Sequence, residues 1–293
     1  MKKKRKLKKG FTRKILILLI GIIVLKYSYP FLNSIELKDG TLIINQNDKV
    51  DNSIYDSVSS QKNNVGTIKD RLKKLSKEDE RINEILDEYN DYPELLLDML
   101  SRNIKMLDFV LDYPDKNGKV YADTIGKVEK GKFPLLLQWD QRWGYGKYGD
   151  DNIAIGGCAP TALSMVIAGL TGKNNITPYD VAKHSEQEGH YLSGTGTSWS
   201  LMTSGVEHFG IIGEELVLTK NNIFRELEAG HPIICSMRAG DFTTTGHFIV
   251  LIGTEEGKIK INDPNSEERS SILWEYSRIE YQIKNLWVFK LKW

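Results

Sequence analysis

The chain of 293 residues has only two cysteines, and one of them stands where a thiol could react. The stretch "IGGCAPTALSMV", residues 155–166, places Cys158 between a glycine pair and Ala-Pro, directly before an apolar pattern of helical period. Because proline is favoured in the first turn of a helix, we expect the thiol at a helix N-terminus, where unpaired N–H groups and the helix dipole stabilise a thiolate. Cys158 is therefore a candidate nucleophile. Cys235, within the apolar run "HPIICSMR", is expected to be an ordinary buried cysteine.

A cysteine nucleophile needs a base, and His247 is the candidate among the five histidines. It opens the strand-like run "GHFIVLIG", which the tight turn "TEEG" joins to a second strand, "KIKIND", ending at Asp263. If the two strands pair as a hairpin, His247 faces Asp263 at its open end, and a slip of two residues keeps both on one face. A carboxylate there would orient the imidazole and stabilise its protonated form, which gives a Cys–His–Asp triad. Asn262 is the alternative orienting residue.

The elements that must position these side chains follow from hydrophobic periodicity. A helical pattern runs from Cys158 to a glycine stop at Gly172, and a second short helix, "NNIFRELEAGHP", ends at Gly230. Four later runs have the composition of strands: "PIICSMR", "GHFIVLIG", "KIKIND" and "NLWVFKLKW". Because helices come first and antiparallel strands follow, the sequence predicts an α+β fold.

Upstream of this α+β part, differences in composition divide the chain into three segments. Residues 67–130 carry two apolar stripes, the second starting at Leu95, which predict a small module of two or three amphipathic helices. Residues 33–66 are rich in Asn, Ser and Asp and form a predicted polar spacer with one short hairpin around "IELKDGTLIIN". The predicted organisation is thus a head at 1–32, the spacer, the helical module and an α+β domain at 131–293.

Charge is distributed unevenly along the chain. The first 14 residues hold nine Lys and Arg and no acid, which leaves 31 basic against 39 acidic residues in the remainder. An acidic body excludes nucleic acid as a partner, because a phosphate backbone requires a basic surface. The basic head precedes eleven uncharged apolar residues, Ile15–Leu25, which is the pattern of a secretory signal or, since no small-residue cleavage site follows, of a signal anchor. The positive-inside rule then predicts a single-pass membrane protein whose large domain lies outside, or a secreted protein if the signal is cleaved.

Four blocks resemble a known family in their order along the chain: "LLLQWDQRWGYGKYG", "GGCAPTALSMV", "DFTTTGHFIVLIG" and "INDPNS". They are similar to papain-fold cysteine peptidases of the bacteriocin-leader-processing type, peptidase family thirty-nine, and most of all to the stand-alone, secreted branch that is not fused to an ABC transporter. The resemblance covers residues 132–293, and the upstream helical segment is similar to the preface of that branch. It implies a papain-like fold, with the nucleophile at the start of a helix packed on an antiparallel sheet. It also implies Cys158 as nucleophile, His247 as general base and then acid, and Asp263 as orienting residue.

The donor that would stabilise an oxyanion is left open by the sequence. Papain-like folds carry a Gln shortly before the nucleophile, but Asn152 stands six positions before Cys158. Gln138 and Gln141, in "LQWDQRW", lie farther upstream. We take Gln138 as the candidate because it matches the family block, with Asn152 next. No Cys and His spacing typical of a metal site is present, and no cofactor is expected.

The sequence therefore predicts a membrane-anchored, outward-facing cysteine peptidase or amidohydrolase that cleaves a peptide or amide bond through an acyl-thioester. Its expected partners are a peptide or protein substrate, a cell-wall peptide among the alternatives, and the membrane through the N-terminal segment. Two other functions stay open. In a thiol acyltransferase, an amine instead of water would resolve the same intermediate. The other is an inactive surface binding module with the same fold, which a disulfide between Cys158 and Cys235 would favour.

Overall fold

The computed structural model describes residues 35–38, 41–44, 67–194 and 196–292, and the chain divides into two units, Met1–Gly66 and Thr67–Trp293. In the first unit, strands β1 (Ile35–Lys38) and β2 (Thr41–Ile44) pair antiparallel, which confirms the predicted hairpin. The predicted basic head and most of the predicted spacer lie outside the described residues.

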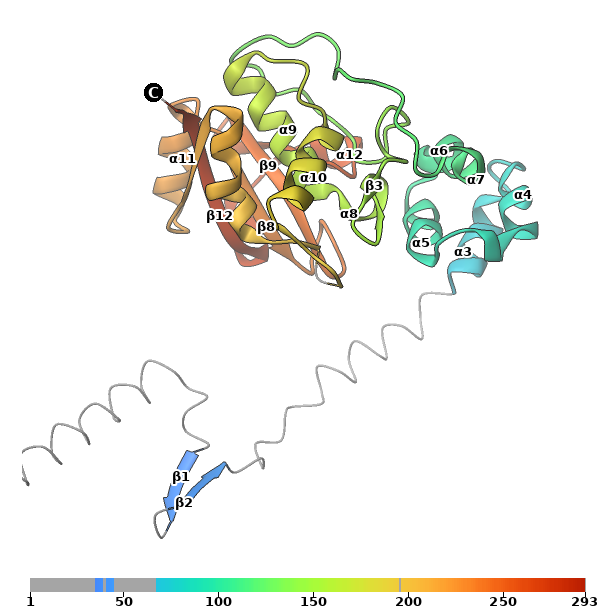
Figure 1. The fold of residues 1–293 in the computed structure, drawn as a ribbon, viewed down its shortest axis with the longest axis horizontal. Helices are drawn as coiled ribbons and strands as arrows, with labels where there is room; N and C mark the ends of the chain where they lie inside the picture. The colour runs from blue at the N-terminus through green and yellow to red at the C-terminus, as the bar shows by residue number, and fades with distance from the viewer. Residues whose placement is uncertain (1–34, 39–40, 45–66, 195, 293) are drawn as a thin grey trace, which may run out of the picture. The chain divides into compact units, whose positions relative to one another are not determined.

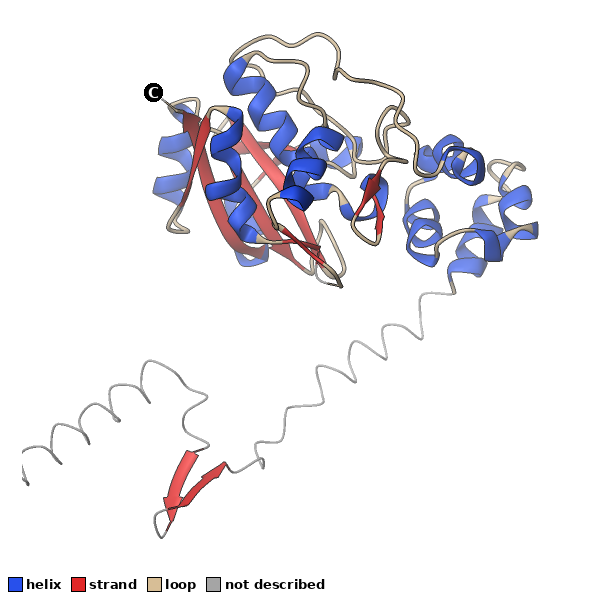
Figure 2. Ribbon diagram, viewed as in Figure 1, coloured by secondary structure: helices blue, strands red, loops and turns tan. Residues whose placement is uncertain are grey.

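The second unit is built on one antiparallel sheet of six strands. Some of its strands are labelled in Figure 1, and strands are red in Figure 2. Every neighbouring pair in this sheet is antiparallel, which confirms the predicted α+β class. In spatial order the strands are β11 (Leu273–Trp274), β10 (Lys258–Asn262), β9 (Gly246–Glu255), β8 (Ile233–Arg238), β12 (Ile283–Leu291) and β7 (Ile211–Glu215). Two short ribbons lie outside it: β3 (Lys147–Tyr148) with β4 (Asp151–Asn152), and β5 (Tyr191–Leu192) with β6 (Gly196–Thr197).

Helices cover both faces of this sheet, because successive apolar side chains along its strands point to opposite faces. Val250 of β9 belongs to the core cluster that includes Leu163 of α9 (Cys158–Thr171), whereas its neighbour Ile249 belongs to the cluster that includes Ile223 of α11 (Lys220–Glu228). α9 ends as predicted, at Gly172 in the left-handed conformation with φ 75°. The remaining helices of this part are α8 (Ile153–Gly156), α10 (Pro178–Gln187), α12 (Glu267–Ser270) and α13 (Tyr276–Ile279), with 3₁₀ turns η4 (Trp199–Met202), η5 (Ser204–Phe209) and η6 (Glu280–Gln282).

The upstream module contains more and shorter helices than the two or three predicted. Within the described residues they are α3 (Ile68–Leu75), α4 (Ile82–Asp87), α5 (Glu94–Arg102), α6 (Leu107–Leu111) and α7 (Tyr113–Lys116), joined in places by η2 (Tyr89–Asp91) and η3 (Ile104–Met106). Leu95, predicted to lie in the apolar stripe, is 60% exposed, because three successive leucines cannot all face one side of a helix. Leu96 and Leu97 are the ones that are buried.

The helical module shares a core with the domain that follows it. The ring of Phe109 stacks on Tyr145 with 4.1 Å between centroids, and the Tyr145 hydroxyl donates to the Phe109 carbonyl at 3.0 Å. Ala154, in α8, belongs to the same apolar cluster as the module helices. The module therefore supports the single helical turn that leads into Cys158.

The hairpin of β9 and β10 has a different register from the predicted one. Near its turn Lys260 lies opposite Gly253, but Ile261 lies opposite Leu251, so Ile252 is an extra residue in β9. This bulge moves the pairing by one position, and beyond it His247 and Asp263 are two positions from facing each other, which puts both side chains on one face. Without the bulge the two side chains would point to opposite faces. The predicted direct opposition is wrong, and the predicted tolerance of a slip by two residues applies.

The predicted localisation at or beyond the cell membrane is wrong. None of the helices in the described part of the chain combines the length and the apolar character that crossing a membrane requires. A span takes about 20 consecutive residues, and the longest described helix, α9, has 14. The run Ile15–Leu25, on which the predicted anchor rests, lies outside the described residues.

Candidate active site

Cys158 is the first residue of α9, at the helix end where the sequence predicted it. Gly157 separates α9 from the single turn of α8, and a Cβ on this glycine would lie 2.5 Å from the carbonyl oxygen of Ile153. No side chain fits there, so the glycine lets the two helical segments pack closely. The first N–H groups of α9 have no partners within the helix and lie next to the cysteine. The Cys158 side chain is partly exposed, which leaves the thiol accessible.

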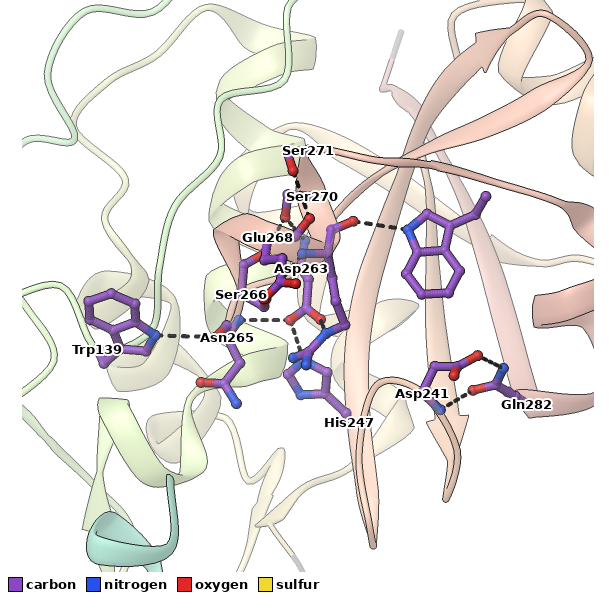
Figure 3. Close-up of polar contacts among 12 residues, drawn as sticks. Trp139, Asp241, His247, Asp263, Asn265, Ser266, Glu268, Ser270, Ser271 and Gln282 are labelled. Atoms are coloured by element: carbon purple, nitrogen blue, oxygen red, sulfur yellow. Dashed lines mark hydrogen bonds and ion pairs between the residues drawn. The ribbon is translucent and has the colours of Figure 1, made fainter. Parts of the chain in front are cut away.

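His247 and Asp263 meet at the open end of the β9–β10 hairpin. The imidazole Nε2 lies 2.7 Å from Oδ1 of Asp263, and Figure 3 shows the two side chains pointing at each other. Asp263 is completely buried and His247 is 8% exposed, so water does not separate them. Because Nε2 is bonded to Asp263, Nδ1 is the ring nitrogen that remains for Cys158.

His247 and Asp263 each shift the pKa of the other so that both side chains favour their charged forms. Burial lowers the pKa of His247, but the charge and hydrogen bond of Asp263 and then the hydrogen bond and charge of Cys158 raise it, with a net rise to about 10. Burial raises the pKa of Asp263, but His247 and then Arg269 lower it, with a net fall below its usual range. The buried acid is thus kept ionised by its cationic neighbours. The structure brings Cys158, His247 and Asp263 into one interacting group.

Gln138 and Asn152 both lie against the turn that precedes the nucleophile. Gln138 Nε2 donates to the Ala154 carbonyl at 2.6 Å, and Asn152 Oδ1 caps α8 by accepting from the Ile155 N–H at 3.1 Å. Asn152 Nδ2 is buried and has no hydrogen-bond partner, whereas in Gln138 it is the oxygen that lacks one. Gln141 lies elsewhere, where it accepts a hydrogen bond from Lys116 of the helical module at 3.2 Å.

The block around Gln138 also holds the loop that carries the acid. The Gln138 backbone N–H donates to the Pro264 carbonyl at 2.8 Å, and the indole of Trp139 reaches the Asn265 carbonyl at 3.4 Å. The amide of Asn262, the alternative orienting residue, donates instead to the carbonyls of Phe133 and Pro134, both at 3.1 Å. Asn262 therefore ties β10 to the preceding segment and leaves the imidazole to Asp263.

The other sequence-derived alternatives have clear positions in the structure. Both cysteines are free: Cys158 packs against the cluster under α9, and Cys235 lies in the cluster on the opposite face of the sheet. Within the described residues, no group of three or more His, Cys, Asp or Glu side chains could hold a metal ion. One site residue was missed by the sequence reasoning: Arg269, which donates to the second oxygen of Asp263.

A comparison with protein-family models assigns the chain. The model described as the Peptidase_C39 like family matches residues 130–288, just over half of the chain. The chain belongs to the C39-like peptidase family. The predicted resemblance to papain-fold cysteine peptidases of this kind is therefore confirmed, and the assignment to the stand-alone branch stays a prediction. No curated protein matches the chain.

Three solved structures of peptidases or proteases are similar to this C39-like chain. One is a putative C39-like peptidase from Bacillus anthracis, 15% identical, which covers 56% of this chain and 96% of its own with a TM-score of 0.37. The peptidase domain of Streptococcus ComA, a bifunctional ABC transporter involved in a quorum-sensing pathway, is 16% identical, covering 55% and 100% with a TM-score of 0.40. A double-glycine-motif protease from an AMS/PCAT transporter, solved with the leader peptide, is 14% identical, covering 59% and 100% with a TM-score of 0.35.

Proposed function

We propose that this C39-like chain is a cysteine peptidase that cleaves a peptide or amide bond through an acyl-thioester. The observation that carries the proposal is the buried His247, which is bonded to Asp263 at 2.7 Å and interacts with the thiol of Cys158 at the start of α9. A thiol at a helix end, a base and an orienting carboxylate are the parts that nucleophilic acyl transfer requires.

Each residue has one chemical task in this reaction. Cys158 gives its proton to His247, and its sulfur attacks the carbonyl carbon and forms a C–S bond. The collapse of the tetrahedral intermediate breaks the C–N bond. His247 gives its proton to the leaving amine. Water then attacks the thioester and His247 takes a proton from it. The C–S bond breaks as the thiolate leaves with a new carboxylic acid, and His247 returns the proton to the sulfur. Asp263 holds the ring orientation and supports the imidazolium in both steps.

The oxyanion that forms in both steps needs a hydrogen-bond donor near Cys158. Gln138 and Asn152 are the two side-chain candidates, and the contacts favour Asn152, because the nitrogen of Gln138 already donates to the Ala154 carbonyl. The unpartnered Nδ2 of Asn152 is a buried donor with unused capacity, which is costly unless a ligand or water meets it. Removal of one oxyanion donor costs about a hundredfold or more in turnover. Asn152→Ala is therefore expected to lower kcat at least a hundredfold, and Gln138→Ala less.

The helical module has a supporting role in this proposal. Its core includes Ala154, whose carbonyl accepts a hydrogen bond from the Gln138 side chain. The module and the block around Gln138 therefore both hold the turn that contains Ala154. We keep the division into a module at 67–130 and a papain-like domain at 131–293, with the module required for a well-ordered nucleophile turn.

A peptide library tests the proposed function directly. Full-length protein is incubated with a mixture of peptides of varied sequence, and products are read by mass spectrometry. We expect new C-terminal carboxylic acids with the wild type and with Cys235→Ala, and none with Cys158→Ala. Cleavage that persists in Cys158→Ala, or that needs Cys235, would contradict the assignment.

The same experiment distinguishes hydrolysis from acyl transfer. With a primary amine added in excess, a hydrolase yields mostly the free acid, whereas an acyltransferase yields the amide. The amide differs from the free acid by the mass of the amine minus the mass of water. The two outcomes differ by mass alone, so the distinction holds for any peptide that the enzyme cleaves.

A further inference from the structure

Arg269 holds the side of Asp263 that faces away from the histidine. Its Nε donates to Oδ2 of Asp263 at 2.5 Å, while Oδ1 accepts from His247 at 2.7 Å and from the Asn265 N–H at 2.8 Å. The carboxylate is completely buried, and both of its oxygens are engaged. Such a pair differs from a surface ion pair, because loss of one partner leaves a buried charge uncompensated.

The segment around α12 is folded so that Arg269 reaches this carboxylate. Ser266 caps α12 by accepting from the Arg269 N–H at 3.1 Å, and the indole of Trp274 donates to the Arg269 carbonyl at 2.9 Å. The backbone N–H of Asp263 donates to the hydroxyl of Ser270 at 2.8 Å, which closes the turn on itself. Figure 3 shows Asp263, Ser266 and Ser270 gathered in this turn beside His247. Both the N–H and the carbonyl of Arg269 are therefore held by hydrogen bonds, which fixes the backbone from which its side chain reaches Asp263.

We propose that Arg269 is a positioning residue of the active site, which holds Asp263 with one oxygen toward His247 and keeps it ionised while the histidine gains and loses its proton. This role rests on the proposed peptidase function. When His247 is neutral, Asp263 loses one of its two cationic partners, and Arg269 remains as the other. The guanidinium suits this task because its charge is permanent and its N–H geometry is fixed.

The charges near this pair set the direction of the expected effect. His247 of β9 and Arg269 of α12 face Asp263, and Cys158 of α9 acts on His247. Asp241, in the loop between β8 and β9, also has its pKa lowered by Arg269, although Arg278 is its main partner. Removing the cation of Arg269 raises the pKa of every titratable group near it. The limbs of a pH profile that depend on His247 and Asp263 are therefore expected to move to higher pH.

The test uses a probe that needs no peptide substrate. Iodoacetamide alkylates a thiolate, forming a C–S bond as iodide leaves, and peptide mapping gives the rate at Cys158 as a function of pH in the full-length protein. In Arg269→Gln we expect the acid limb to move up by about one pH unit. We also expect kcat for peptide cleavage to fall about ten- to a hundredfold with little change in KM. Arg269→Lys keeps the charge, so its limb should stay near the wild-type position while the maximal rate falls.

Two matched variants separate positioning from general stability. Arg278→Gln removes another Arg–Asp pair, at 2.9 Å to Asp241, and should leave the profile unchanged. In an Asp263→Asn background, Arg269→Gln should have a much smaller effect than in the wild type, because the residue acts mainly through Asp263.

The outcomes separate cleanly. An Arg269→Gln profile with unmoved limbs would overturn the proposal, and so would an equal shift in the Asp263→Asn background. If Arg269→Gln does not fold, an Arg269→Lys protein with the full wild-type rate would overturn it too. If Cys158 in the native wild-type protein reacts no faster than Cys235 does in the unfolded protein, the proposed peptidase function is contradicted, and the role of Arg269 with it.

Discussion

The start of α9 and the middle of β8 each carry one of the two cysteines, and the two regions treat the same side chain in opposite ways. Cys158 is partly exposed, begins a helix and interacts with His247. Cys235 is completely buried, with Ile249 opposite on β9 and Leu286 opposite on β12. Burial raises the pKa of the Cys235 thiol far above its ordinary value, because the apolar surroundings cannot solvate a thiolate.

This difference indicates that the environment of a cysteine depends on the element that carries it and not on the residue type. In the middle of β8 the backbone N–H groups are used in the ladder, and the residues opposite Cys235 on both neighbouring strands are apolar. A helix start offers free N–H groups, access to solvent and room for a second element to bring a base. If this contrast is correct, variants at the two cysteines and at their neighbours should differ in activity, in labelling and in stability.

The largest effect is expected from removing the sulfur of Cys158. Cys158→Ala should lower peptide cleavage by roughly a thousandfold or more, because the nucleophile is lost and only binding and oxyanion contacts remain. Cys235→Ala is the matched control and should retain activity within a factor of two or so. Rates with a fluorogenic peptide selected from the library give the comparison. Equal losses of cleavage rate in the two variants would show that the position of Cys158 at the helix start does not make it the nucleophile.

Loss of the base should reduce reactivity at one cysteine only. His247→Ala should slow cleavage by about a hundredfold or more, and iodoacetamide labelling of Cys158 near neutral pH should slow as well. The control is His231→Ala, because His231 is also paired with a carboxylate, Glu226 at 2.9 Å, in the loop before β8. Labelling in native protein, followed by peptide mapping, measures both cysteines at once. A His231→Ala variant as slow as His247→Ala would point to general destabilisation.

The same interaction should make stability depend on pH. The pKa of His247 is raised from 6.5 to about 10, so its contribution is fully present below about pH 6.5 and is lost as the pH rises through 10. We expect wild-type unfolding free energy to fall by on the order of a few kcal/mol over this interval. Urea unfolding at several pH values measures it. His247→Ala should remove most of this dependence, Cys158→Ala should reduce it, and Cys235→Ala should leave it intact.

Much of this arrangement was predictable because it depends on local patterns. The 3.6-residue periodicity after Cys158 and the left-handed Gly172 define α9, and the apolar run around Cys235 defines β8. The same patterns predicted that one cysteine would be placed for chemistry and the other buried. The turn of the β9–β10 hairpin was also evident, and Glu256 and Gly257 adopt the positive φ values of 52° and 73° that a two-residue hairpin turn requires.

What escaped prediction depends on contacts between distant segments or on single irregularities. The bulge at Ile252, which decides whether His247 and Asp263 share a face, has no sequence signal because any apolar residue can occupy it. Arg269 lies in the polar stretch "SEERS", where one arginine looks like any other exposed cation. The stacking of Phe109 on Tyr145 joins the helical module to the domain across 36 positions, which periodicity does not report.

The smallest expected effect is on stability and again contrasts the two sites. Cys235→Ala should cost about 1 kcal/mol, the size of an Ile→Val change, since one heavy atom is removed from a filled core. Cys235→Ser should cost more than the alanine variant, because it buries a hydroxyl between apolar strands. At Cys158, serine should cost no more than alanine, because the partly exposed side chain keeps access to water and to the helix N–H groups. Thermal unfolding of the four variants orders these losses, and a Ser-over-Ala penalty as large at Cys158 as at Cys235 would mean that the two environments are alike in polarity.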